Sequence, residues 1–261
     1  MEHNLNPDEC YERNGFYLAP PMVPVELVER AAAHIDAVMA GQYETGIPPQ
    51  ARGWNPGDDP SRLCKIDQPH YCDRTIHELI SHPAIGGTAA QITGAKMIRV
   101  FAVQLLHKPP GGQPDTSVGW HQDRQYWAKW WDEATNALTA WVAISDVTPS
   151  SGPVLFLRGS HRWGFLDQGD FFGNDLDALR NDIDLPDGAV WDEVPGLLEP
   201  GAVSFHHRLT YHGSRPNLSD SARRGFAIHL RTEDSRPVPG ADHHYLEIRE
   251  DEHRSPIVHR A

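Results

Sequence analysis

Seven short segments with β-strand character follow one another between residues 97 and 230. Turn residues separate them, and they cover residues 97–107, 118–122, 138–144, 154–157, 202–206, 211–214 and 224–230. Many short strands with turns between them are typical of a sandwich or a jelly roll. Before them, residues 25–39, 74–81 and 83–93 have helical periodicity. We therefore expect a mainly β protein, a cupin-like jelly roll (double-stranded β-helix) with N-terminal helices packed on one sheet.

The chain length predicts a single domain. A chain of 261 residues buries roughly three quarters of its unfolded surface. We expect a mainly helical part over residues 1–95, a barrel core over 96–232 and a polar, partly mobile tail over 233–261. Within the core, residues 164–196 form a long connection with nine acidic residues and one basic residue. A connection of that length is either a lid or a solvated surface excursion.

Charge and cysteine content limit the partners and the location. The net charge of -13 argues against nucleic acid and anionic membrane surfaces as partners. No apolar run approaches the roughly 18 residues of a membrane span, and the N-terminus does not resemble a signal peptide. Cys10, Cys64 and Cys72 form neither an even disulfide framework nor a metal motif. We expect a cytoplasmic protein with reduced thiols, and its oligomeric state stays open.

The most informative motif is His121-Gln122-Asp123. In an extended strand, residues two apart project from the same face, so the imidazole and the carboxylate would point into one space. His212 offers a third ligand downstream. Two histidines and one carboxylate form the facial triad of non-haem Fe(II) oxygenases, whereas a closed structural zinc site needs four protein ligands. We predict an Fe(II) site; the alternative for the motif alone is a strand histidine hydrogen-bonded to a carboxylate.

Arg223 lies eleven residues after His212, and the turn-rich sequence between them predicts that both sit on neighbouring strands of one hairpin. On the second strand, Arg223 shares a face with the small residues Gly225 and Ala227, which leaves room for a bound acid. Arg224 lies on the other face, which is expected to pack against a sheet or a helix. An arginine can hold a carboxylate by two parallel hydrogen bonds. The alternative for either arginine is a surface ion pair.

The constellation of His-x-Asp, distal histidine and arginine resembles the 2-oxoglutarate-dependent dioxygenases. Residues 105–111, 140–146, 152–161 and 212–217 resemble the phytanoyl-CoA dioxygenase family, and the resemblance runs from about residue 14 to about residue 230. It implies an oxidoreductase that uses Fe(II), O2 and 2-oxoglutarate and releases succinate and CO2. It also implies further co-substrate contacts at Lys65, Gln104, Trp141 and Ser214.

Aromatic residues follow the metal motif directly. Together with Arg124, the residues Tyr126, Trp127 and Trp130 are expected to form a wall for an apolar or ring-bearing substrate. The alternative is that the tryptophans cover the edge of the barrel.

The expected reaction is oxidation, by hydroxylation, of a C–H bond in a small organic metabolite, such as an intermediate of a secondary-metabolite pathway. The acidic chain is expected to disfavour a CoA thioester, whose phosphates carry like charge. A neutral or cationic, partly aromatic molecule is expected instead. The same cofactor chemistry ending in epimerisation, desaturation or cyclisation stays open, as do a different cupin-type metalloenzyme and a binding protein without catalysis.

Overall fold

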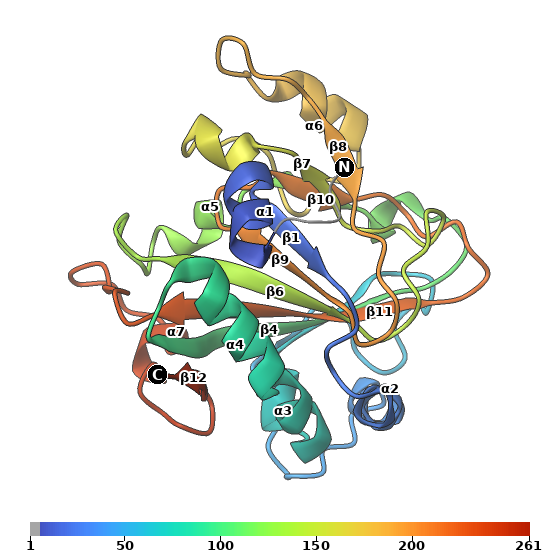
Figure 1. Ribbon diagram of the computed structural model, residues 1–261. Helices are drawn as coiled ribbons and strands as arrows, with labels where there is room; N and C mark the ends of the chain where they lie inside the picture. The colour runs from blue at the N-terminus through green and yellow to red at the C-terminus, as the bar shows by residue number, and fades with distance from the viewer. Residues whose placement is uncertain (1–5) are drawn as a thin grey trace.

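Two antiparallel sheets face each other across a cavity in the computed structural model, which describes residues 6–261 (Figure 1). The larger sheet runs in the order β1 (Phe16–Ala19), β9 (Val203–His207), β6 (Ala137–Ala143), β11 (Arg223–Thr232), β4 (Met97–Lys108), β3 (Cys64–Asp67) and β2 (Ala51–Arg52), with β12 (Ile257–Arg260) also paired to β4. The smaller sheet runs in the order β5 (Val118–His121), β10 (His212–Ser214), β7 (Leu155–Leu157) and β8 (Glu193–Pro195). The predicted double-stranded β-helix is therefore confirmed.

Helices cover the outer face of the larger sheet, as the sequence predicts (Figure 1). These helices are α2 (Val25–Met39), α3 (Arg74–Ile80) and α4 (Pro83–Thr93). At helical spacing, α2 contributes Val28, Ala31 and Ile35 to a large buried cluster. The same cluster holds Ile228 of β11, so the main core lies between the helices and the sheet. The shorter helix α1 (Pro7–Asn14) ends at Gly15, whose φ of 84° favours glycine, and leads into β1.

The inner face of the larger sheet lines the cavity, and strand alternation decides which side chains reach it. On β11, Ala227 and His229 line the cavity together with Arg223. Arg224 points to the opposite face, where its guanidinium lies 2.7 Å from the Asp36 carboxylate of α2. This is the orientation that the sequence pattern predicts for the two arginines.

Residues 164–196 leave the barrel as an excursion that carries α6 (Leu176–Asp182) and β8 (Figure 1). Its first part is held on β5 by two backbone hydrogen bonds, from the Gly119 N–H to the Phe171 carbonyl and from the Asp170 N–H to the Trp120 carbonyl, both 3.0 Å long. A Cβ atom added at Gly119 would overlap the Asp170 carbonyl oxygen, so this close approach requires glycine. The remaining short elements are α5 (Arg124–Trp127), α7 (His244–Glu247) and the 3-10 helices Pro69–Tyr71, Pro114–Thr116 and Ser160–Trp163.

The C-terminal residues, which the sequence suggests to be a polar and partly mobile tail, make specific contacts with the larger sheet. β12 pairs with β4, and the Ser255 hydroxyl donates to the Val100 carbonyl at 2.5 Å. The Arg99 guanidinium, 3% exposed, lies 3.1 Å from carboxylate oxygens of both Glu250 and Glu252. The tail is therefore attached to the larger sheet, while the domain boundaries at residues 95 and 232 stay predictions.

No helix between residues 6 and 261 combines the length and the apolar character needed to cross a bilayer.

Candidate metal centre

His121, Asp123 and His212 converge at one end of the cavity. His121 ends β5, His212 begins β10, and the two residues are direct partners in the pairing of these strands. The Nε2 atom of each histidine lies 3.8 Å from Oδ1 of Asp123. Their Nδ1 atoms lie 2.8 Å and 3.0 Å from the backbone carbonyls of Gly119 and Thr210. A neutral imidazole has one N–H, so donation from Nδ1 leaves both Nε2 lone pairs for a metal ion.

The side chains of His121 and Asp123 meet for a different reason from the one that the sequence suggests. β5 ends at His121, and Asp123 has helical backbone angles (φ -54°, ψ -36°) at the start of α5. The expectation of one extended strand through both residues is therefore wrong. The chain turns into α5 immediately after His121, and this turn brings the carboxylate back to the imidazole.

The expected hairpin between His212 and Arg223 is also wrong. β10 lies in the smaller sheet and β11 in the larger sheet, so the two strands are not neighbours. The side chains of His212 and Arg223 nevertheless line the same cavity, because they face each other from opposite sheets.

The three ligand candidates have the protonation states that a divalent metal requires. Burial lowers the pKa of His121 and of His212 below the usual value for imidazole. Burial alone would raise the pKa of the Asp123 carboxyl, but His212 and the other nearby histidines hold it well below its usual range. Two neutral imidazoles and one carboxylate at neutral pH match the donor set of a non-haem iron site.

The second carboxylate oxygen of Asp123 is also held. Oδ2 accepts a hydrogen bond of 2.6 Å from the Thr139 hydroxyl and lies 3.3 Å from Nε2 of His206. The Thr139 hydroxyl in turn lies 2.9 Å from Nδ1 of His229. Partners of this kind fix the orientation of a metal-binding carboxylate. The sequence analysis did not identify Thr139 or His229 as site residues.

Two buried basic side chains lie at the other end of the cavity, Arg223 in its lining and Lys108 beside Ser214. Arg223 is 1% exposed, its guanidinium lies 5.0 Å from the centre of the Trp141 ring, and its Nε and Nη1 find no hydrogen-bond partner among residues 6–261. The ammonium group of Lys108 donates to Ser214 Oγ at 2.7 Å and to the Arg215 carbonyl at 2.6 Å. Burial lowers the pKa of Arg223 to about 10, and burial and the Arg223 charge lower that of Lys108. A carboxylate bound here would satisfy the free donors of Arg223.

The predicted co-substrate contacts are divided between two pockets. Gln104, Trp141 and Ser214 line the inner cavity together with the three ligand candidates and Arg223. Lys65 does not line this cavity; it lies in an adjoining outer pocket, where its ammonium group is 2.6 Å from the Asp67 carboxylate. Lys65 therefore pairs with Asp67 in the outer pocket and does not line the inner cavity that Arg223 lines.

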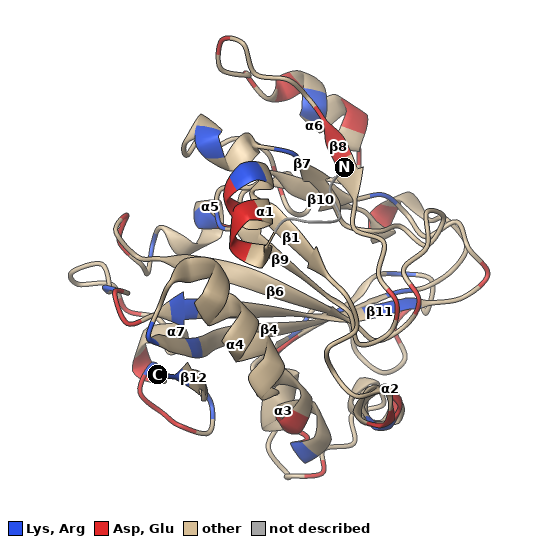
Figure 2. Ribbon diagram, in the orientation of Figure 1, with Lys and Arg blue, Asp and Glu red and all other residues tan. Residues whose placement is uncertain are grey.

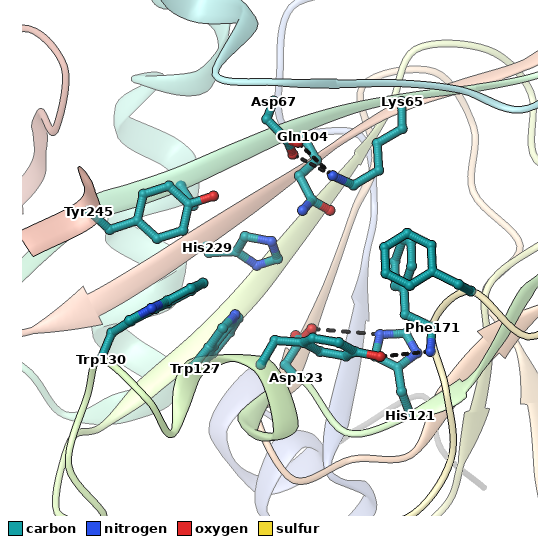
Figure 3. A pocket seen from close by; sticks show the side chains of 13 residues that line it. Lys65, Asp67, Gln104, His121, Asp123, Trp127, Trp130, Phe171, His229 and Tyr245 are labelled. Atoms are coloured by element: carbon teal, nitrogen blue, oxygen red, sulfur yellow. Dashed lines mark hydrogen bonds and ion pairs between the residues drawn. The ribbon is translucent and has the colours of Figure 1, made fainter. Parts of the chain in front are cut away.

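The outer pocket opens beside His121 and Asp123 and has aromatic walls (Figure 3). The predicted wall residues Tyr126, Trp127 and Trp130 line it. Phe171 and Phe172 come from the excursion, and Tyr245 comes from the C-terminal residues. Arg124 lines neither pocket: its guanidinium donates to the Asp132 carbonyl at 3.0 Å and lies 5.6 Å from the Phe165 ring.

Sequence comparisons relate the chain to known dioxygenases. Residues 11–225 match the family model for phytanoyl-CoA dioxygenase. A probable alpha-ketoglutarate-dependent hypophosphite dioxygenase of Stutzerimonas stutzeri is 28% identical over 192 residues, which cover 70% of this chain and 62% of that relative. An ectoine dioxygenase of Halomonas elongata is 26% identical over 255 residues, covering 88% of this chain and 70% of that protein.

The fold has solved counterparts as well. The crystal structure of the epimerase SnoN in complex with Fe3+, alpha ketoglutarate and nogalamycin RO superposes with a TM-score of 0.74 and 22% identity, covering 97% of both chains. At this identity the match shows a shared fold.

Proposed function

The chain belongs to the phytanoyl-CoA dioxygenase family, and on that premise we propose that it oxidises a C–H bond of a small organic molecule. Membership confirms the predicted class of enzyme, an Fe(II)- and 2-oxoglutarate-dependent dioxygenase. Iron, O2 and 2-oxoglutarate supply the oxidising power when bound, with succinate and CO2 as co-products. The observation that carries the proposal is one cavity with two histidines and an aspartate clustered at one end and a buried arginine with free donors at the other.

In this proposal His121, Asp123 and His212 hold one face of the iron. Arg223 anchors the far carboxylate of 2-oxoglutarate through Nε and Nη1, the atoms that are free in the structure. Lys108 keeps Ser214 in place beside this carboxylate through the hydrogen bond to its hydroxyl. The protein thus positions the co-substrate between a fixed metal site and a fixed cation.

The test uses the metal and co-substrate alone. Anaerobic protein with Fe(II) should develop a visible charge-transfer band when 2-oxoglutarate is added. The Arg223→Met variant should need a much higher 2-oxoglutarate concentration for the same band, whereas Arg224→Met should behave like the unmodified protein. The absence of any band in the unmodified protein would refute the proposed cofactor chemistry.

The substrate is a small molecule other than a CoA thioester. The net charge is -13, and among the charged residues of α6 and β8, Asp177, Asp182 and Glu193 are acidic and Arg180 is basic (Figure 2). Phe171 and Phe172 of this excursion line the outer pocket, so its contribution to the pocket wall is aromatic. Like charges disfavour the approach of a ligand with several phosphates. Succinate release that acyl-CoAs stimulate, and free small molecules do not, would contradict this.

Hydroxylation is the proposed outcome. A product that gains one oxygen supports hydroxylation, a loss of two hydrogens indicates desaturation or cyclisation, and an unchanged mass indicates epimerisation. We also propose a cytoplasmic location, where Cys64 and Cys72, neither of them in a disulfide, remain thiols. Burial raises the pKa of Cys64 to about 11 and that of Cys72 to about 12, so both are poor nucleophiles in the folded protein.

A further inference from the structure

A chain of three side chains leads from the metal site to the outer pocket. Asp123 Oδ2, the Thr139 hydroxyl and His229 Nδ1 follow one another at 2.6 Å and 2.9 Å. Thr139 and His229 are direct partners on the adjacent strands β6 and β11, so this arrangement is built into the sheet. The strand pairing therefore fixes His229 relative to Asp123.

The chemistry of these groups fixes the tautomer of His229. The Thr139 hydroxyl donates to Oδ2 of Asp123, since a carboxylate that binds a metal can only accept hydrogen bonds. Thr139 has one hydroxyl proton, and donation to Asp123 uses it. The Thr139 oxygen can then only accept from His229, so His229 carries its proton on Nδ1. The neutral ring is left with a bare lone pair on Nε2.

This lone pair is available to a ligand. His229 lines both the inner cavity and the outer pocket, and its ring projects into the outer pocket in Figure 3. Trp127 packs edge-on against the ring at 5.0 Å between centroids, which holds the ring in place. Within residues 6–261, Nδ1 makes the hydrogen bond to Thr139, whereas Nε2 has none and is not fully enclosed.

The surroundings indicate what kind of molecule would meet this acceptor. In Figure 3, Trp127, Trp130 and Tyr245 lie on one side of the pocket and Phe171 on the other. Aromatic side chains on opposite walls of a pocket suit a flat ring between them. The family model ends at residue 225, so His229 and Tyr245 lie beyond the part of the chain that it matches.

We propose that His229 is a substrate-recognition residue, whose Nε2 accepts a hydrogen bond from a hydroxyl or N–H group on a flat aromatic or heteroaromatic substrate. The ring of the substrate lies between the aromatic walls, and the hydrogen bond turns one edge of it toward His121 and Asp123. This inference rests on the proposed function, because it uses the metal site as the point of reaction. A quaternary ammonium ion could also bind among aromatic side chains, but it offers no donor to His229.

The tautomer is tested in the metal-free protein by long-range proton–nitrogen NMR of 15N-labelled histidine. The resonances of His229 are assigned by their loss in His229→Gln. We expect a protonated Nδ1 and a bare Nε2 at pH 7.5, and a change in this pattern in Thr139→Val. Protonation on Nε2 instead would overturn the proposal.

Recognition is tested with phenol and anisole, two flat rings that differ in one hydrogen-bond donor. Their affinities are measured by tryptophan fluorescence in anaerobic protein with Fe(II) and 2-oxoglutarate. Phenol should bind roughly two- to tenfold more tightly than anisole, the effect of one neutral hydrogen bond. His229→Asn keeps a donor for Thr139 but has no atom at the position of Nε2, so it should lose this preference. His229→Gln, which can place an oxygen near that position, should retain part of it.

The outcomes separate the inference from the proposed function. If the charge-transfer band appears, the cofactor chemistry stands, and three results would still overturn the role of His229. These are equal binding of phenol and anisole, no binding of either, and tighter binding of choline than of phenol. An unchanged preference for phenol in His229→Asn also overturns it. If the band is absent from the unmodified protein, the proposed function itself fails.

Discussion

Replacing Arg223 with methionine should stabilise the metal-free protein while removing its response to 2-oxoglutarate. Burial lowers the pKa of Arg223 to about 10, well below that of a guanidinium in water. This difference corresponds to a cost on the order of 3 kcal/mol for the buried charge. Methionine is also unbranched and can fill much of the same space without a charge. The variant loses the contact with the Trp141 ring, worth about 0.5–2 kcal/mol.

The expected net gain is about 1–2.5 kcal/mol, which for a chain of this size raises Tm by roughly 2–5 °C. Removing Arg223 also relieves the repulsion that lowers the pKa of Lys108, an effect in the same direction. In the unmodified protein with Mn(II), 2-oxoglutarate at a hundred times its Kd should add about 2.7 kcal/mol. In Arg223→Met this increase should be absent, because the anchoring charge is missing.

Thermal unfolding followed by circular dichroism, with and without Mn(II) and 2-oxoglutarate, measures both effects. Arg224→Met is the matched control, since Arg224 pairs with Asp36 on the outer face of the sheet. This control should keep the 2-oxoglutarate response and should not gain stability. A lower Tm for metal-free Arg223→Met, or an unchanged response to 2-oxoglutarate in that variant, would refute the reasoning.

Thr139→Val removes the hydroxyl that holds Asp123, so this variant should bind Mn(II) about 10- to 100-fold more weakly, as measured by calorimetry. Thr139→Ser keeps the hydroxyl and should bind Mn(II) almost normally. Equal Mn(II) affinities of the two variants would contradict the role of the Thr139 hydroxyl. Burial lowers the pKa of His70 and His207 to about 3 and that of His107 to about 4. Below pH 6.5 the unfolded chain therefore takes up protons that the folded chain does not, and the metal-free protein should lose about 1.4 kcal/mol per histidine between pH 7.5 and 5.5. Urea unfolding at both pH values measures this loss, and equal or greater stability at pH 5.5 would exclude it. Acyl-CoAs should leave the rate of succinate release at its background value, as an assay with free CoA as control would show.

Most of the fold prediction rested on strand periodicity. A strand that buries one face alternates between two kinds of residue, and this alternation can be read from the local sequence. Arg223 and Arg224 illustrate this: alternation along the strand was enough to assign one to the cavity and the other to the helices. The pairing of strands is not local, and the hairpin expected between His212 and Arg223 failed for that reason. A turn-rich connection shows that the chain reverses, but it does not show which sheet receives the next strand.

The supporting side chains of the site could have been found in part. Thr139 lies two residues before Trp141, and Lys108 lies four residues after Gln104, so alternation places each on the cavity face of its strand. The sequence does not show which side chains Thr139 and Lys108 contact in the folded protein. The hydrogen bond from Thr139 to Asp123 depends on how α5 turns back over the sheet, and that geometry exists only in the folded chain.

The attachment of the excursion to β5 has a consequence for how this enzyme can diverge. Gly119 and Gly169 each lie in close contact with the backbone of the other segment. A Cβ atom at Gly119 would overlap the Asp170 carbonyl oxygen, and one at Gly169 would overlap the Trp120 carbonyl oxygen. These two positions should therefore tolerate almost no replacement. Leu176 and Ile183 of the excursion are buried in the same cluster as Trp120 of β5, so α6 is packed on the strand that carries Gly119 and His121. New substrate preferences are therefore expected to arise at Phe172, which is 76% exposed and lines the outer pocket, while the glycine contacts keep β5 and His121 in place.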